Sequence, residues 1–155
     1  KLNANQKKKV DQHFKTKVLA YLQSYVFNIS KHAPFLNNQQ LYLAVKLKKD
    51  HEALFGYVNI PSNSLPRFLS VPLDGGQHGF IYLDDIVRDN IEYVFPGFEI
   101  SECRSIKLNK NADLNIDDEF SGDLVQKIEK QIKKRNLGRP SRFLYDGNMS
   151  DELLR

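Results

Sequence analysis

FPGFEISECRSIKLNKNAD, residues 95–113, is the stretch around which the rest of the chain is arranged. Pro96 and Gly97 end the segment before it, and residues 98–108 favour a β-strand because alternate positions can face a core. This strand is predicted to run into a polar turn at residues 109–113. Together with Lys107, the turn carries two cations, two amides and a carboxylate, which is typical of strand ends that touch ligands or neighbouring domains.

Upstream, the hydrophobic pattern predicts one long helix and then a series of strands. Residues 6–26 place apolar side chains at helical spacing and most lysines outside that stripe. The stripe consists of Val10, Phe14, Val18, Tyr21, Leu22 and Tyr25. Residues 41–47 alternate as a half-buried strand does, and further strands are expected at 54–60 and 67–71, with a short extended piece at 80–82.

Downstream, the pattern predicts more helices and one further strand. A helix is expected at residues 84–95 with Asp84 as its N-cap. Another opens at residues 117–119 and stops at Gly138, a strand covers residues 141–145, and Ser150 caps a terminal helix. The order of elements predicts a single α+β domain, a mixed β-sheet packed with amphipathic helices.

Length and composition are those of one ordinary domain. The chain has 155 residues, of which 41% are hydrophobic and 27% charged, and no apolar run approaches the length of a membrane span. We therefore expect a soluble protein. The single cysteine, Cys103, excludes an internal disulfide, fits a reducing compartment, and is predicted to fill the core rather than to act as a nucleophile.

The charge distribution is uneven, although the net charge is only +4. Residues 127–142 hold seven cations against one anion, which favours an acidic partner or, alternatively, a solvated helix face with cations near its C-terminus. Further cations are expected beside strand ends, at Arg67, Arg104, Lys107, Lys110, Arg139 and Arg142.

The residues that carry chemistry do not form a recognisable catalytic or metal motif. The four histidines lack metal-ligand spacing, and the paired carboxylates at residues 84–85 and 117–118 stand where predicted helices begin. No glycine-rich phosphate loop is present. His78, in a Gly-Gln-His-Gly turn, is the weak remaining candidate for phosphate chemistry. The sequence therefore predicts no catalytic residue and no metal ligand.

The order of several short motifs resembles the middle, or head, domain of the long-chain polyphosphate kinases. The run Ile-Lys-Leu-Asn-Lys-Asn-Ala-Asp at residues 106–113 follows Phe-Pro-Gly-Phe-Glu at 95–99. Other landmarks appear in the same order on both sides, at residues 35–38, 41–45, 65–68, 123–124, 135–138 and 140–142. The resemblance covers most of the chain, although no single motif decides it.

This resemblance implies that residues 1–155 are the head domain of a larger multidomain enzyme. Such a kinase reversibly transfers the terminal phosphate of ATP to inorganic polyphosphate through a phosphohistidine, with Mg²⁺. The family's catalytic histidines and principal ATP contacts belong to other domains, so no catalytic residue is carried over. The head domain is expected to support the catalytic domains and a homodimer or higher oligomer. We expect a cytoplasmic enzyme, with membrane association through the full enzyme left open, and no DNA partner.

Five residues are the candidates for contact with a phosphate chain or with a neighbouring domain, and the sequence leaves both readings open. They are Arg67, Lys107, Lys110, Asp113 and Arg142. Lys107 and Lys110 match positions where many family members are expected to have arginine, so the charge is kept while the bidentate geometry is lost. The rival hypotheses are a free-standing module that binds RNA or polyphosphate, and a small phosphate-handling enzyme that uses His78.

Overall fold

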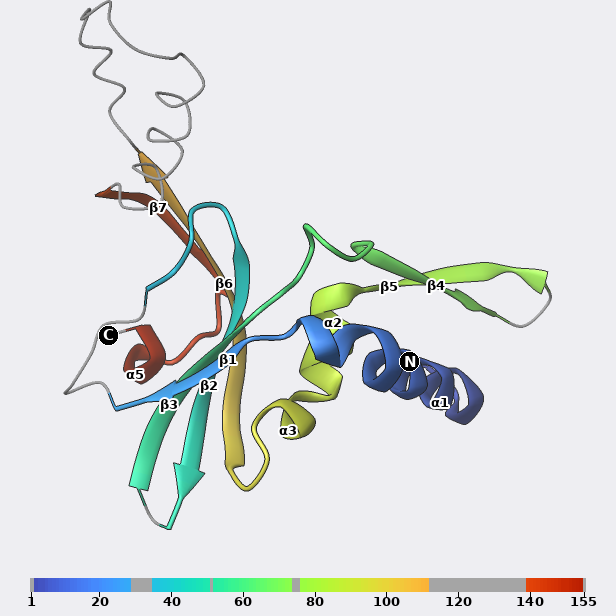
Figure 1. Cartoon of the computed structure of the whole chain (residues 1–155), viewed down its shortest axis with the longest axis horizontal. Helices are drawn as coiled ribbons and strands as arrows, with labels where there is room; N and C mark the ends of the chain where they lie inside the picture. Colours follow the sequence, from blue (N-terminus) through green and yellow to red (C-terminus); the bar gives the residue numbers. More distant parts are fainter. Residues whose placement is uncertain (1, 29–34, 51, 74–75, 112–138, 155) are drawn as a thin grey trace, which may run out of the picture.

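The computed structural model describes residues 2–28, 35–50, 52–73, 76–111 and 139–154. A five-stranded sheet with the order β1-β3-β2-β6-β7 forms its body, and a two-stranded ribbon, β4-β5, extends from it (Figure 1). Each strand pair in both sheets is antiparallel. The helices α1, α2 and α3 lie on the ribbon side of the sheet, while α5 lies on the other side (Figure 1). The α+β class is confirmed.

The central strand β2, Leu41–Lys49, is buried on both faces. Leu43, Val45 and Leu47 face one hydrophobic core, whereas Tyr42 and Ala44 face a second. Side chains alternate between the faces of a strand, so this one element organises both cores. The half-buried strand predicted at residues 41–47 is therefore real but covered on both faces. β3, Glu52–Asn59, confirms the strand predicted at residues 54–60.

The larger core lies between the sheet and the N-terminal helical segment. That segment consists of α1 (Ala4–His13), a π-helical turn (Phe14–Val18) and a 3-10 turn (Leu19–Tyr21). Val10, Phe14 and Val18 are fully buried, as the predicted stripe requires. They pack with side chains of β2, β3, α2 and α3. Burial of a side chain of this size contributes about 1.5–3 kcal/mol.

The smaller core lies on the opposite face of the sheet. It joins Leu36, Tyr42 and Ile106 to Met149, which precedes α5 (Asp151–Leu154). Ile106 belongs to β6, Glu99–Asn111, which pairs with both β2 and β7 (Arg139–Tyr145). In the part of the chain that the structure describes, α5 is the helix that packs on this face, through Leu153. The strand predicted at residues 141–145 is confirmed.

The ribbon is built from β4, Phe68–Pro72, and β5, His78–Tyr82. These strands confirm the expected strand at residues 67–71 and the short extended piece at 80–82. Val71 reaches the larger core, and the side chain of Gln6 donates a hydrogen bond to the Pro72 carbonyl at 2.7 Å. One face of the ribbon is thus held against α1.

The first predicted helix extended too far, to residue 26. Helical structure ends at Tyr21, and β1, Ser24–Phe27, begins three residues later. Tyr21 and Tyr25, which were assigned to the apolar stripe, are half exposed. The backbone of β1 finds hydrogen-bond partners in β3, and this tertiary pairing overrides the local helical periodicity.

The helix predicted at residues 84–95 is two helices. α2 (Leu83–Asp89) and α3 (Ile91–Val94) are separated by Asn90, whose side chain donates to the Ile86 carbonyl at 3.0 Å. Asparagine side chains compete with the backbone in this way and interrupt helices. Asp84 is not the N-cap as predicted, because Tyr82 holds that position and Asp84 lies in the first turn.

The polar turn predicted at residues 109–113 is wrong for its described part. Asn109, Lys110 and Asn111 continue β6, because β7 pairs with the strand as far as Asn111. The helix predicted between residues 117 and 138 and the candidate Asp113 lie outside the described residues. The terminal helix is confirmed, although the Ser150 hydroxyl bonds to Glu102 instead of capping it.

Candidate functional site

The candidate cations of β6, Lys107 and Lys110, lie on opposite faces of the sheet. Lys107 and Asn109 share the face of Ser105, which Arg88 of α2 contacts. Arg142 of β7 pairs with Asn109 and lies on the same face. Lys110, one residue further, points to the face that carries the smaller core. Lys107 and Lys110 therefore do not converge as a single turn would have made them.

Lys110 is held on its face by an aromatic contact. Its ammonium lies 4.4 Å from the centroid of the Phe35 ring, and its backbone N–H donates to Asn38 Oδ1 at 2.8 Å. A cation over an aromatic face is stabilised by about 0.5–2 kcal/mol, depending on its solvation. This arrangement fixes a positive charge beside the edge of the smaller core.

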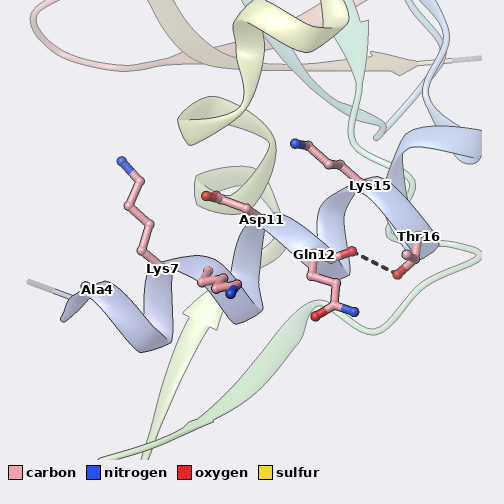
Figure 2. A pocket seen from close by; sticks show the side chains of 7 residues that line it. Ala4, Lys7, Asp11, Gln12, Lys15 and Thr16 are labelled. Carbon is pink, nitrogen blue, oxygen red and sulfur yellow. Dashed lines mark hydrogen bonds between the residues drawn. The ribbon is translucent and has the colours of Figure 1, made fainter.

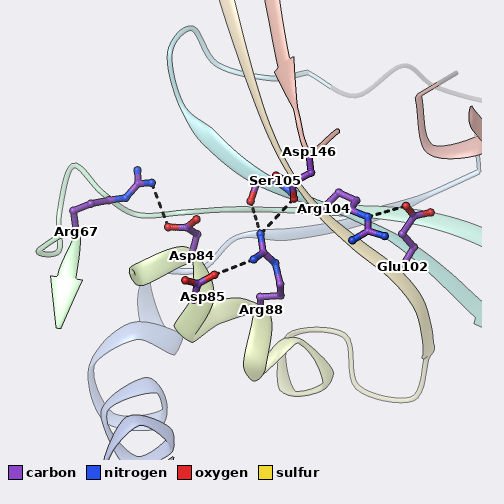
Figure 3. A network of polar contacts seen from close by, with 8 residues as sticks. All are labelled: Arg67, Asp84, Asp85, Arg88, Glu102, Arg104, Ser105 and Asp146. Atoms are coloured by element: carbon purple, nitrogen blue, oxygen red, sulfur yellow. Dashed lines mark hydrogen bonds and ion pairs between the residues drawn. The ribbon is translucent and has the colours of Figure 1, made fainter. Parts of the chain in front are cut away.

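Arg67 lies at the base of the ribbon and forms an ion pair with Asp84. The distance from Arg67 Nη2 to Asp84 Oδ1 is 3.2 Å (Figure 3). Asp84 thus serves α2 through its first-turn position and through this pair. Among the described residues, the buried Arg67 Nε has no hydrogen-bond partner. Arg67, a sequence candidate for contact with a phosphate chain or a neighbouring domain, thus makes a charged contact within the fold, between ribbon and helix.

A polar network centred on Arg88 connects α2 to β6 and to the end of β7. Its guanidinium donates to Asp85 Oδ1 at 2.9 Å and to Ser105 Oγ at 2.5 Å, and lies 3.6 Å from Asp146 Oδ2 (Figure 3). Asp146 also accepts the Ser105 backbone N–H at 2.8 Å. One arginine therefore holds three parts of the chain together.

A second polar cluster lies across β6, on the side of α5. Glu102 accepts from Arg104 Nε at 3.0 Å and from both the backbone N–H and the hydroxyl of Ser150, at 2.9 and 2.5 Å. The Ser150 hydrogen bonds, first of all, lower the pKa of Glu102 below its usual range. Nearby, Lys46 and Glu152 form an ion pair that connects β2 to α5.

Two other groups near the network have raised pKa values. Burial, followed by the charge of Asp84, raises the pKa of Asp85, and Arg88 only partly opposes this. Burial likewise raises the pKa of Cys103 to about 11. Cys103 packs against the larger core, as predicted, and its thiol stays protonated at neutral pH.

A shallow hollow of about 700 Å³ runs along the exposed side of α1 and the π-helical turn (Figure 2). Its lining includes three lysines, Lys7, Lys8 and Lys15, with Asp11 as the acidic group. Lys15 donates to the Tyr93 hydroxyl at 3.0 Å, which raises the Lys15 pKa, and its ammonium lies 4.3 Å from that ring's centroid. This surface suits an anionic ligand weakly, since it is open to solvent.

The remaining candidates show no catalytic arrangement in the described part of the chain. His78 is exposed at the start of β5, with its Nδ1 3.4 Å from Ser70 Oγ. Among the described residues, no three histidine, cysteine or carboxylate side chains are grouped as a metal ion requires. Within the same residues, no helix is long and apolar enough to cross a membrane.

Sequence reasoning did not find the central role of Arg88. The available signal was local, because Asp85 and Arg88 are three residues apart and face each other on a helix. Their tertiary partners, Ser105 and Asp146, come from a strand and a loop far along the chain, and nothing in their sequence spacing connects them to Arg88.

Three comparisons agree on the relatives of this fold. Residues 5–155 match the family model described as the polyphosphate kinase middle domain. The chain is 30% identical over 143 residues to polyphosphate kinase of Bacillus anthracis, and 30% identical over 158 residues to that of Halalkalibacterium halodurans. These alignments cover 88% and 99% of the chain but only 20% and 22% of the relatives. The chain thus spans about a fifth of their length.

A solved structure gives the same result. The crystal structure of polyphosphate kinase from Porphyromonas gingivalis matches 99% of the chain, and 21% of its own chain, with a TM-score of 0.75 and 28% sequence identity. The architecture is thus that of an α+β domain found within a larger phosphotransferase. The chain belongs to the polyphosphate kinase family and corresponds to its middle domain.

Proposed function

We propose that this chain is the non-catalytic head domain of a polyphosphate kinase. The parent enzyme reversibly transfers the terminal phosphate of ATP to inorganic polyphosphate through a phosphohistidine. The observation that carries the proposal is the match to the family's middle domain over residues 5–155. ATP and Mg²⁺ bind mainly to other parts of the protein, which is cytoplasmic.

The head domain supports the catalytic domains and the assembly of a homodimer or higher oligomer. Two features favour a supporting role. Charged groups that could do chemistry are engaged in holding the fold, as Arg67 with Asp84 and Arg88 with Asp146. In addition, large apolar side chains remain exposed on the ribbon, where Phe80 is 72% and Phe68 52% exposed. Exposed apolar surface of this kind is typical of contacts with other domains.

Lys107 and Arg142 are the candidates for contact with the polyphosphate chain or a neighbouring domain on the α2 side of the sheet, and Lys110 is the candidate on the other side. A chain of closely spaced anions is bound by Lys and Arg held at intervals, which adjacent strands provide. Arg142 is exposed and Lys107 is half-buried. Their shared face makes this pair the better candidate for one continuous contact.

The test replaces these cations in the full-length protein, with Lys107→Ala/Arg142→Ala compared with Lys110→Ala. We expect the double variant to raise the KM for polyphosphate in the reverse reaction several-fold if the pair contacts the chain, or to weaken assembly if the pair contacts another domain. Lys110→Ala, on the opposite face, should have the smaller effect. Unchanged activity and assembly in both variants would remove these residues from the proposal.

A second candidate function is a free-standing module for RNA or polyphosphate. The observation that favours it is the lysine-lined hollow on α1, with Lys7, Lys8 and Lys15. The mass of the native protein separates the two functions. A blot of cell extract should show a band several times larger than the 18.0 kDa of this chain. A band at that mass, with salt-sensitive RNA binding, would favour the module instead.

A further inference from the structure

A small pocket on the α5 side of the sheet is independent of the contacts described above. It has a volume of about 280 Å³ and lies where β1, β2 and β3 meet the segment before β2. Four aromatic and four amide side chains line it: Gln23, Tyr25, Phe35, Asn37, Gln40, Tyr42, Tyr57 and Asn59. A pocket of this size accepts one ring system, since sites for whole drug-sized ligands start at about 300 Å³.

The aromatic rings give the pocket flat apolar surfaces. Tyr25 and Tyr57 stack with centroids 5.0 Å apart and an interplanar angle of 22°, and Tyr42 meets Tyr57 edge-on at 5.7 Å. Tyr25 and Phe35 are 51% and 56% exposed, so these rings are accessible. Exposed rings held in place by their neighbours are surfaces on which a planar ligand stacks.

The amide groups divide into those that hold the pocket and those that can bind. Gln40 donates to the Ile60 carbonyl and accepts from Asn63, while Asn59 accepts from the Gln23 backbone at 2.6 Å. In the described part of the chain, the side-chain amides of Gln23 and Asn37 make no hydrogen bond. An Asn or Gln amide offers a donor and an acceptor side by side, which matches the paired donor and acceptor edge of a nucleobase.

Charge is excluded from the lining but present beside it. All eight lining residues are uncharged, and burial, then Tyr25 and Tyr42, raises the pKa of Tyr57, so that its hydroxyl remains a neutral donor at physiological pH. The ammonium of Lys110 lies 4.4 Å from the ring centroid of Phe35, one of the lining residues. The neutral pocket therefore suits a ring, and the adjacent cation suits an anionic group attached to that ring.

We propose that this pocket binds the base of a nucleotide, stacked on Tyr25 and hydrogen-bonded by Asn37, with its phosphate toward Lys110. The inference does not rest on the proposed function, because it follows from the pocket alone. In a polyphosphate kinase, this site would be separate from the ATP site that we place mainly outside the chain. It would make the head domain a second place where nucleotide is bound.

The experiment measures the binding of labelled AMP to the full-length protein by equilibrium dialysis, which counts sites and gives their affinities. We expect one class of sites to weaken about tenfold or more in Tyr25→Leu, since the base loses the aromatic ring on which it stacks. Asn37→Asp, which loses the amide donor at constant size, should weaken the same class of sites. Any AMP site elsewhere should be unaffected by either change.

Tyr82→Leu is the matched control, because Tyr82 is 50% exposed on a strand and lies 5.1 Å from the Phe68 ring, much as Tyr25 lies beside Tyr57. It should leave AMP binding unchanged. The proposal is overturned if Tyr25→Leu and Asn37→Asp bind AMP like the parent protein. It is also overturned if ribose 5-phosphate, which lacks a base, competes as well as AMP does. Competition by glucose but not by adenosine would likewise overturn it, because the pocket would then bind a sugar instead of a base.

Discussion

Arg88 contributes to the fold more than its place on a short helix suggests. Its guanidinium contacts Asp85, Ser105 and Asp146, so it joins α2 to β6 and to the loop after β7. Hydrogen bonds to charged groups contribute more than neutral ones, and removing one partner leaves the others unpaired. The arginine is therefore a structural residue rather than a ligand contact.

The Arg88→Ala variant of this chain should be less stable by about 1–3 kcal/mol, because two carboxylates lose their cation and Ser105 loses its donor. Urea unfolding followed by circular dichroism measures this difference. Arg142→Ala is the control, since Arg142 is exposed, and it should change stability by less than about 0.5 kcal/mol. Equal effects of the two substitutions would show that the Arg88 network adds no more to the free energy of unfolding than an exposed arginine does.

Ser150 makes the stability of the fold depend on pH through Glu102. The folded-state pKa of Glu102 is lowered from 4.5, so its ionised form stabilises the fold above about pH 4.5. This stability is lost as pH falls through the lowered pKa. Ser150→Ala removes the hydroxyl bond, so the variant should be less stable than the parent at pH 7, and the difference should shrink as the pH falls below 4.5 and through the lowered pKa of Glu102.

Chemical denaturation of both proteins from pH 7 to pH 3 checks this prediction. Asp85, whose pKa shifts upward, contributes pH dependence of the opposite sign, but it does so equally in both proteins. The difference between the two curves therefore isolates Glu102. A difference that stayed constant across the whole range would mean that the Ser150 hydroxyl does not act through Glu102.

At the scale of elements, β3 requires a glycine where it passes under the helices. A Cβ on Gly56 would lie 2.9 Å from Phe95 Cε1 and 2.9 Å from the Tyr25 carbonyl oxygen. The second contact is backbone, in the neighbouring strand β1, and it cannot move aside cheaply. Gly56 therefore allows β1, β3 and the larger core to approach closely.

The Gly56→Ala variant should lose about 1–3 kcal/mol of stability through overpacking. Thermal or urea unfolding measures the loss. Gly147→Ala is the matched control, because nothing lies within 4 Å of a Cβ at that position. A Gly56→Ala protein as stable as the control would contradict the close packing described for these strands.

Most strands were predictable because their alternation is local. Residues 41–47, 54–60 and 141–145 have patterns that the sheet uses directly, and Val10, Phe14 and Val18 give a helical stripe that the core uses directly. The predictions that failed concern segments whose structure depends on partners distant in sequence. β7 extends β6 through the polar residues 109–111, and β3 converts residues 24–27 from helix to strand.

The candidate site was predictable only in part for the same reason. The sequence predicted Arg67, Lys107, Lys110 and Arg142 as cations near strand ends, but Lys107 lies well inside β6. A shift of one residue along a strand also changes the face on which a side chain lies. An apparent turn thus became a strand that separates Lys107 from Lys110. The amides and tyrosines of the pocket come from four segments, so no single stretch of the sequence contains them all.

At the scale of the whole molecule, different elements cover the two faces of the sheet. Among the described residues, one face carries α1, α2, α3 and the ribbon, while the other carries α5 (Figure 1). The aromatic pocket lies on the same side as α5. The relatives are about five times longer than this chain, which covers 20% of the first of them. We therefore expect the exposed ribbon and the face that carries α5 to meet other parts of a larger protein.

The most direct test of the account captures the native protein from cell extract with an antibody against this chain and measures polyphosphate formation. With ATP and Mg²⁺, the captured protein should form acid-insoluble polyphosphate, since we place this chain within a polyphosphate kinase. The isolated 155-residue chain should form none, because its described residues include no catalytic arrangement. Polyphosphate synthesis by the isolated chain, or none by the captured native protein, would contradict the account.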